Sequence, residues 1–164
     1  MHPCPCGKMS ILGHNDKCEC SEYEIRRYQK RLSKPLKDRI DIFNYVPLIN
    51  LDEFKNGKGA ENSKEIRERV IKSREIQSDR FKNTNYKFNS DMKGKDIFEL
   101  CKINKNAKKI LEDYFKLNTP SIRGYGKVIK VAQTIADIEG KEEIKSQHVI
   151  EAINYRRDIS GEFI

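Results

Sequence analysis

The chain has 164 residues, and its 33 Lys and Arg outnumber its 25 Asp and Glu, which gives a formal net charge of +8. This length fits one domain, or one domain with a small additional unit, and no stretch approaches the roughly 20 apolar residues that a membrane-spanning helix needs. The first residues lack the basic and then apolar pattern of a signal peptide. We therefore predict a cytoplasmic protein without a membrane partner. The positive charge favours a polyanionic partner or reflects solvated Lys-rich helices.

The first twenty residues hold four of the five cysteines, in a C-x-C-x11-C-x-C pattern: Cys4, Cys6, Cys18 and Cys20. Two close pairs joined by a loop are able to supply the four thiolates that a structural zinc ion takes. Disulfide or redox chemistry and reduced, metal-free thiols are the alternatives. His14 lies between the pairs and is either a substitute ligand or a solvated loop residue. The fifth cysteine, Cys101, is predicted to be a small buried core residue.

The first half of the chain alternates helical and irregular patterns. Residues 21–24 (Ser-Glu-Tyr-Glu) form a capping box, which predicts a helix from about residue 22 to about residue 32. Pro35 ends it, because proline disfavours helix in the residue before it. The β-branched and aromatic run 40–47 predicts a short strand, and the polar segment 52–62 predicts a loop. Residues 63–82 carry seven basic and four acidic side chains without Gly or Pro, which indicates a mostly solvated helix.

Helical periodicity dominates the second half of the chain. Short helices are predicted at about 95–101, 106–117 and 146–156. The clearest helix is predicted to follow Thr119 as N-cap and Pro120 as first residue, and to end at Gly140. It carries one apolar stripe, made of Ile122, Tyr125, Val128, Ile129, Ala132, Ile135 and Ala136. The fold is thus predicted to be mainly α, with a helical bundle behind a small strand-bearing N-terminal part.

The chain lacks the motifs of a complete nucleotide-hydrolysing site. A P-loop needs G-x4-G-K-[ST] after a strand. Neither Gly57-Lys58-Gly59 nor Gly124-Tyr125-Gly126-Lys127 has that spacing, and no hydrophobic strand ends in the acidic residues of a Walker B motif. We therefore predict that this chain alone has no ATPase activity.

Two arginines nevertheless lie at positions suited to phosphate. Arg39 precedes the predicted strand, and Arg123 lies in the first turn of the clearest helix. A helix N-terminus favours anions, and a guanidinium there adds a bidentate donor. The alternative for each arginine is a surface ion pair, which contributes little.

Four stretches carry long motifs: Pro-Cys-Pro-Cys-Gly at 3–7 with Cys-x-Cys-Ser at 18–21, IRRYQKRLSKPLKDRID at 25–41, IRERV and REIQ-x-x-RF within 66–81, and S-x-R-x-Y with KVA-x-TIAD-x-EG within 121–140. Together they resemble the magnesium-chelatase-like AAA+ ATPases, a family that includes bacterial competence proteins acting as branch-migration helicases. The resemblance covers nearly the whole chain. One departure is His2, where the family has an Asn before Pro-Cys-Pro-Cys.

The resemblance implies that the chain corresponds to the family's C-terminal part, with the Walker motifs upstream, so we expect a fragment of a longer protein. It implies three parts. Residues 1–51 would be the end of the AAA+ core, with a Cys-rich knuckle at residues 1–20 and an arginine-finger segment. Residues 52–94 would be a linker and a basic helix, and residues 95–164 the helical lid.

The resemblance also implies roles for both arginines. Arg39 would be the arginine finger, reaching in trans the γ-phosphate bound by a neighbouring subunit. Arg123 would be the sensor-2 residue that binds the ATP phosphate and couples the lid to the nucleotide state. The implied cofactors are ATP and Mg²⁺, and the implied partners are identical subunits in a hexameric ring, with DNA as substrate for remodelling or branch migration.

Two other functions remain open from the sequence. One is a non-enzymatic zinc-knuckle module that binds nucleic acid through Arg26, Arg27, Arg31 and the helix at 63–82. The other is the motor subunit of a metal chelatase, which would share the ATP chemistry and differ in substrate. A nucleic-acid binder is distinguished by a steep loss of affinity with salt.

Overall fold

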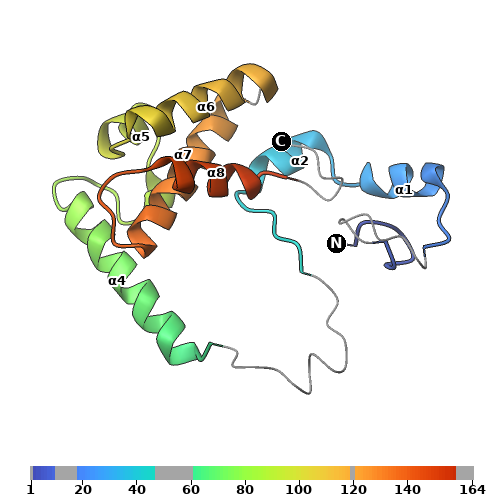
Figure 1. Ribbon diagram of the computed structural model, residues 1–164, viewed down its shortest axis with the longest axis horizontal. Helices are drawn as coiled ribbons and strands as arrows, with labels where there is room; N and C mark the ends of the chain where they lie inside the picture. The colour runs from blue at the N-terminus through green and yellow to red at the C-terminus, as the bar shows by residue number, and fades with distance from the viewer. Residues whose placement is uncertain (1, 10–17, 47–60, 119–120, 158–164) are drawn as a thin grey trace. The chain divides into compact units, whose positions relative to one another are not determined.

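The computed structural model describes residues 2–9, 18–46, 61–118 and 121–157 (Figure 1). The chain forms two compact units, Met1–Leu48 with Asn154–Ile164, and Ile49–Ile153. Every regular element in the described ranges is helical: α1 (Glu22–Gln29), α2 (Lys34–Arg39), α4 (Ser63–Phe81), the 3-10 helix η1 (Asn89–Asp91), α5 (Asp96–Leu100), α6 (Lys105–Asn118), α7 (Ile122–Ile138) and α8 (Ser146–Asn154). The mainly α fold predicted from the sequence is confirmed.

The first unit begins with a helix whose start the sequence predicted. Ser21 Oγ accepts a hydrogen bond from the Glu24 N–H at 3.3 Å, and Glu24 Oε2 accepts one from the Ser21 N–H at 2.9 Å. This reciprocal capping box satisfies two amides that have no partner within the helix. The helix α1 ends at Gln29, before the expected residue 32. Neither α1 nor α2 contains a buried residue.

The short strand predicted at 40–47 is wrong for residues 40–46, the part that the structure describes. Pro35 lies instead in the first turn of α2, a helix that the sequence did not predict, and the chain then runs without regular structure. The Phe43 N–H donates to the Tyr155 carbonyl oxygen at 2.9 Å. One such bond makes no ladder, and a strand needs a partner that pairs with it along several residues. β-branched composition therefore favoured an extended backbone here without producing a sheet.

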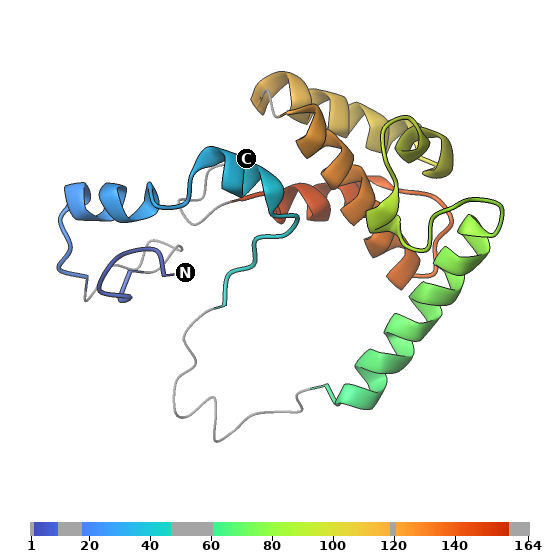
Figure 2. The same cartoon turned by 180° about the vertical axis from the view of Figure 1, so that it is seen from behind.

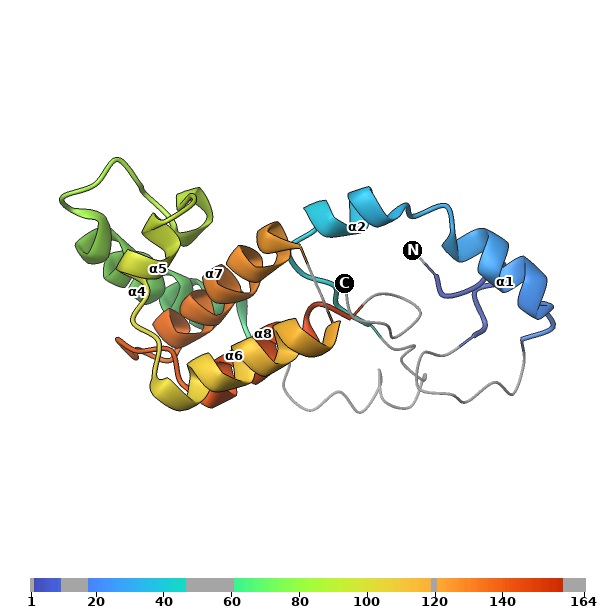
Figure 3. The ribbon, with the colours of Figure 1, turned by 90° about the horizontal axis from the view of Figure 1, so that it is seen from above.

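The helix α7 lies at the centre of the second unit, where it packs against α4, η1 and α5 (Figures 2 and 3). It buries most of the predicted apolar stripe, namely Val128, Ile129, Ala132 and Ala136. Ile122, the first residue of that stripe, is 88% exposed. The helix α6 adds a ring contact, because Phe115 and Tyr125 have centroids 4.3 Å apart. No helix in the described ranges is long and apolar enough to cross a membrane.

Both ends of α7 are set by local hydrogen bonds. Ser121 is the N-cap, and its Oγ accepts from the Gly124 N–H at 3.0 Å, so the predicted cap at Thr119 is wrong; residues 119–120 themselves lie outside the described ranges. At the other end Gly140 has φ +67°, as predicted for a terminal glycine. Its N–H donates to the Asp137 carbonyl, and the Lys141 N–H donates to the Ala136 carbonyl at 2.8 Å. This pair of bonds is a Schellman motif.

Candidate functional site

The four N-terminal cysteines lie in one cluster in the first unit. All four Sγ atoms are within 4.8 Å of one another: Cys4, Cys6, Cys18 and Cys20. The Cys4 and Cys6 sulfurs are 3.3 Å apart, and the Cys18 sulfur is 3.6 Å from each of them. Gly7, with φ +75°, turns the chain back and donates its N–H to the Cys4 carbonyl at 3.2 Å. The cluster therefore offers four sulfur ligands at one point, whereas His14 lies outside the described ranges.

The thiols of this cluster differ in acidity. A hydrogen bond from the Lys8 backbone, with help from the Cys4 side chain, lowers the pKa of Cys6 from 9.0 to about 6. The Cys6 backbone lowers the pKa of Cys20 in the same way, but the Cys6 side chain, desolvation and Cys18 outweigh it and raise that pKa to about 12. Neighbouring thiolates repel one another, so a thiol beside an ionised one keeps its proton. Ionisation of one thiol in this cluster therefore opposes ionisation of its neighbours.

Arg39 is the last residue of α2, so the expectation that it stands at the entrance of a strand is wrong. Its side chain is exposed, and its Nη1 donates to the Pro35 carbonyl at 2.9 Å, one helical turn back. The residues after Arg39 are tied to the other end of the chain, because Arg156 Nη1 donates to the Ile40 carbonyl and Phe43 donates to Tyr155. Arg39 thus presents an accessible guanidinium from a braced backbone.

Arg123 is the second residue of α7, in the second unit. Its side chain is exposed, and it has no hydrogen bond or ion pair with any other residue within the described ranges. The partial positive charge of a helix N-terminus and this guanidinium act on the same volume of solvent. The sequence-based alternative of a surface ion pair therefore finds no partner among the described residues, and the arrangement suits an anionic ligand.

A buried polar network that sequence reasoning missed joins α4, η1 and α7. Asp137 is 1% exposed and forms an ion pair with both terminal nitrogens of Arg80, one of them at 2.9 Å. Asn89 Nδ2 donates to Asp137 at 2.8 Å and to Thr134 Oγ1 at 3.1 Å. Gln133 Nε2 donates to Asp137 at 3.0 Å. The sequence did contain one signal: Asp137 follows Ala136 on the inward face of an apolar helix. A carboxylate buried there needs a cationic partner.

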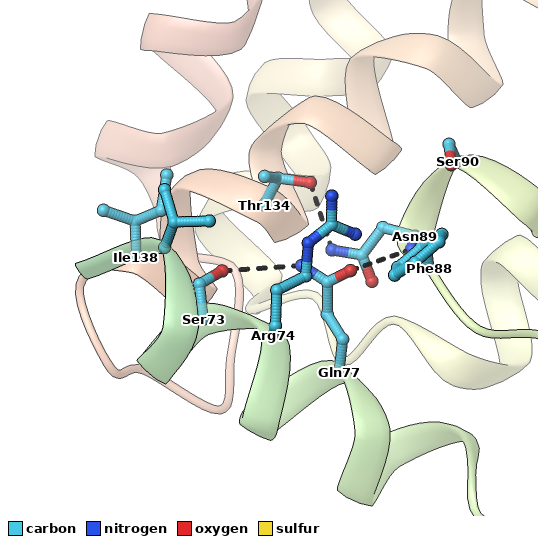
Figure 4. A pocket seen from close by; sticks show the side chains of 9 residues that line it. Ser73, Arg74, Gln77, Phe88, Asn89, Ser90, Thr134 and Ile138 are labelled. Atoms are coloured by element: carbon cyan, nitrogen blue, oxygen red, sulfur yellow. Dashed lines mark hydrogen bonds between the residues drawn. The ribbon is translucent and has the colours of Figure 1, made fainter. Parts of the chain in front are cut away.

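A surface pocket of about 300 Å³ lies beside this network (Figure 4). Its polar lining is already hydrogen-bonded internally: Gln77 donates to Ser73 Oγ at 3.4 Å and accepts from the Asn89 N–H at 3.2 Å. At its rim the Arg74 guanidinium lies 4.0 Å from the centroid of the Phe88 ring. These hydrogen bonds hold α4 against η1, so the polar residues that line the pocket have a structural role.

Comparisons with known proteins match both parts of the chain. The family described as magnesium chelatase, subunit ChlI C-terminal, matches residues 60–156, and the family described as magnesium chelatase, subunit ChlI, matches residues 1–54. Competence protein ComM of Haemophilus influenzae is 38% identical over 157 residues, which are 95% of this chain and 29% of that protein. An uncharacterised protein, YifB, of Salmonella typhimurium is 34% identical over the same shares.

A more distant relative matches this chain over a similar share of its length. The uncharacterised protein Rv2897c of Mycobacterium tuberculosis is 26% identical over 156 residues, which cover 95% of this chain and 30% of that protein. The chain therefore spans about three-tenths of the length of the curated relatives it matches. The family matches cover more than half of the chain and agree with the long motifs of its sequence. The chain belongs to the magnesium-chelatase-like family of which ComM and YifB are members.

Proposed function

We propose that this chain supplies an arginine finger and a sensor-2 lid to an ATP-driven AAA+ motor that works as a hexameric ring in the cytoplasm. The observation that carries the proposal is the exposed guanidinium of Arg123 at the N-terminal turn of α7, which has no partner among the residues that the structure describes. In this role ATP and Mg²⁺ are bound chiefly by residues outside this chain, because the chain has no P-loop motif. The three-part division at residues 51/52 and 94/95 belongs to the same proposal.

Arg123 would hold the terminal phosphate through the guanidinium and the first-turn amides of α7. The contacts of α7 with α4, η1 and α5 make it the central helix of its unit. A displacement of Arg123 would therefore move α7 together with the helices packed against it. This arrangement supports coupling between nucleotide state and lid angle, which is a hinge motion.

Arg39 would act on the nucleotide held by a neighbouring subunit. It projects from the end of α2, and Arg156 and Tyr155 hold the backbone that follows it. Arginine fingers supplied in trans stabilise charge in the phosphoryl-transfer transition state, with effects of roughly 10³–10⁵ on the rate. Such a residue affects turnover more than nucleotide binding.

DNA is the proposed substrate of the motor. The relative from Haemophilus influenzae is named a competence protein, and this chain carries a net charge of +8. The exposed face of α4 contributes basic side chains to that charge, among them Lys64, Arg67 and Lys72. A positively charged surface attracts the phosphate backbone. A metal-chelatase substrate would leave these charges without a polyanionic partner, which favours DNA.

The test uses a protein that joins this chain to the remaining length found in its relatives. Arg39→Ala should abolish ATP turnover and leave nucleotide affinity nearly unchanged, whereas Arg123→Ala should weaken both. Lys34→Ala, on the same short helix as Arg39, and Lys109→Ala, exposed on α6, are the matched controls. Normal turnover by Arg39→Ala in an assembled ring would make the finger assignment wrong.

A mixing experiment tests action in trans. Arg39→Ala subunits combined with subunits that carry an inactivated P-loop should recover part of the lost activity, because some interfaces then pair an intact finger with an intact nucleotide site. No recovery in any ratio would place Arg39 in its own subunit's site.

The second candidate is a nucleic-acid-binding module that needs no ATP, with Arg26, Arg27 and Arg31 as phosphate contacts. Arg26 and Arg27 are exposed, and the 3.4 Å pair of Arg26 with Glu22 is also exposed and therefore weak. Binding of this chain alone to DNA should then fall by about 0.9 log unit per log unit of salt for each phosphate contact. Absent binding at low salt would exclude this candidate and leave the motor proposal intact.

A further inference from the structure

We propose that Cys4, Cys6, Cys18 and Cys20 bind one Zn²⁺ as four thiolates, and that this ion fixes the knuckle to α1 and so orders the first unit. The inference rests on the geometry of the cluster and does not depend on the ATP-driven role. Four protein thiolates fill a tetrahedral zinc ion and leave no open position, so the ion is structural rather than catalytic.

The sulfur positions match the size of a zinc tetrathiolate. Zinc–sulfur bonds of about 2.3 Å, arranged as a regular tetrahedron, place neighbouring sulfurs about 3.8 Å apart. The sulfur separations among Cys4, Cys6 and Cys18 are 3.3, 3.6 and 3.6 Å, and no pair in the cluster exceeds 4.8 Å. Side-chain movements that change these separations by no more than about 1 Å therefore create the coordination shell.

Disulfides explain this arrangement less well. A disulfide brings two sulfurs to about 2.0 Å and separates them from other cysteines. Here Cys4, Cys6 and Cys18 form a triangle of three mutual contacts, with Cys20 nearby as a fourth member. A common ligand at the centre accounts for all four positions at once.

The backbone around the first pair also suits a thiolate-bound metal. Gly7 closes the turn on Cys4, and the Lys8 backbone N–H points to the Cys6 sulfur. Such N–H donors stabilise ligating sulfurs and orient them. Zinc binding displaces the protons of those thiols that still carry one, and these protons pass to solvent.

The ion has a structural task because the first unit offers little else to hold the knuckle. The helices α1 and α2 bury no residue. A hydrogen bond links the knuckle to α1, from Gln29 Nε2 to the Pro3 carbonyl at 3.0 Å. Pro3 lies next to Cys4 and is itself buried. Zinc at Cys4 would therefore hold the acceptor in place and, through Gln29, anchor the C-terminal end of α1.

The first experiment measures metal in this chain, purified without an affinity tag under reducing conditions and reconstituted with ZnCl₂. About one zinc per chain should survive gel filtration, and Co²⁺ in its place should give the absorption of a tetrahedral thiolate complex. Cys4→Ser and Cys18→Ser should lose the ion. Cys101→Ala, which removes the buried cysteine of the second unit, should keep it.

Three results would overturn the proposal: no retained metal, iron in preference to zinc, or equal loss in Cys101→Ala. The structural role has its own readout. Removing zinc with a chelator should raise amide exchange in α1 by about ten-fold and leave α7 unchanged, because only the first unit depends on the ion. Gln29→Ala should keep full zinc content and reproduce part of that increase. Unchanged exchange in α1 after zinc removal would refute the ordering role.

Discussion

In the first unit α1 and α2 bury no residue, whereas in the second unit α7 alone buries nine. The second unit has an ordinary apolar core, including Phe81, Met92, Ile97, Leu111 and Val128. Burying such side chains is the main source of folding free energy. The first unit lacks that source in its helices, and its described contacts include a capping box, a few hydrogen bonds and the cysteine cluster. One family sequence thus contains two units with different kinds of stabilisation.

The largest expected effect of a substitution lies in the buried network of the second unit. Asp137→Ala should lower the free energy of unfolding by about 3–5 kcal/mol, because it leaves the mostly buried Arg80 guanidinium without its counter-charge. The control is the exposed 2.7 Å pair of Arg69 with Glu61, where Arg69→Ala should cost less than about 1 kcal/mol. Urea unfolding followed by circular dichroism measures both. Equal effects would contradict the contrast between a buried and an exposed ion pair.

Truncation of an apolar side chain should likewise lower the free energy of unfolding more in the second unit than in the first. Leu111 is 0% exposed in α6, and Leu111→Ala should cost about 2–5 kcal/mol. Leu36 is 47% exposed in α2, and Leu36→Ala should change the stability by no more than about 0.5 kcal/mol. A large drop in the melting temperature of Leu36→Ala would show that the first unit buries this side chain. It would contradict the contrast between the two units.

Two capping boxes allow a matched test of how each unit supports its helix. Ser21→Ala removes the cap of α1, and Asn62→Ala removes the cap of α4, where Asn62 accepts from Lys64 and Glu65. Each loss is about 1 kcal/mol. Hydrogen exchange should show opening of all eight residues of α1, which has no buried face, but only the first turn of the 19-residue α4. Opening limited to one turn in both helices would contradict the expectation that α1 depends on its cap more than α4 does.

The smallest expected effect concerns the pH dependence of the second unit. The His148 side chain, with Nε2 at 3.0 Å from Glu139, lowers the pKa of Glu139 below its usual value of 4.5. His148 Nδ1 accepts from the Lys145 N–H, so Nε2 carries the hydrogen that Glu139 accepts. A carboxyl whose pKa is lowered by folding adds stability above its unfolded pKa and loses it as the pH falls through the folded pKa.

Carbon-detected NMR titration of the Glu139 carboxyl measures this shift directly. Its midpoint should lie below the usual value of 4.5. His148→Ala should return the midpoint of Glu139 toward its usual value, and the stability difference between Glu139→Gln and the unaltered chain should shrink in acid. A midpoint unaffected by His148→Ala would contradict the assignment.

Local signals in the sequence were sufficient for most helices. The capping box at Ser21 and the terminal glycine Gly140 both lie where the sequence placed them, because each depends on contacts within a few residues. The cysteine pattern likewise pointed to the four sulfurs that the structure brings together. The family followed from long motifs, since those survive without knowledge of the packing.

Tertiary structure decided what depends on distant partners. The segment after Arg39 has the composition of a strand, yet in its described residues 40–46 it bonds to the Tyr155 carbonyl through Phe43 and forms no regular strand. Arg80 and Asp137 are 57 positions apart, and nothing local to either residue identifies the other. A buried charge lowers the folded state's stability unless a counter-charge reaches it, so the role of Asp137 exists only once α4 and α7 have packed together.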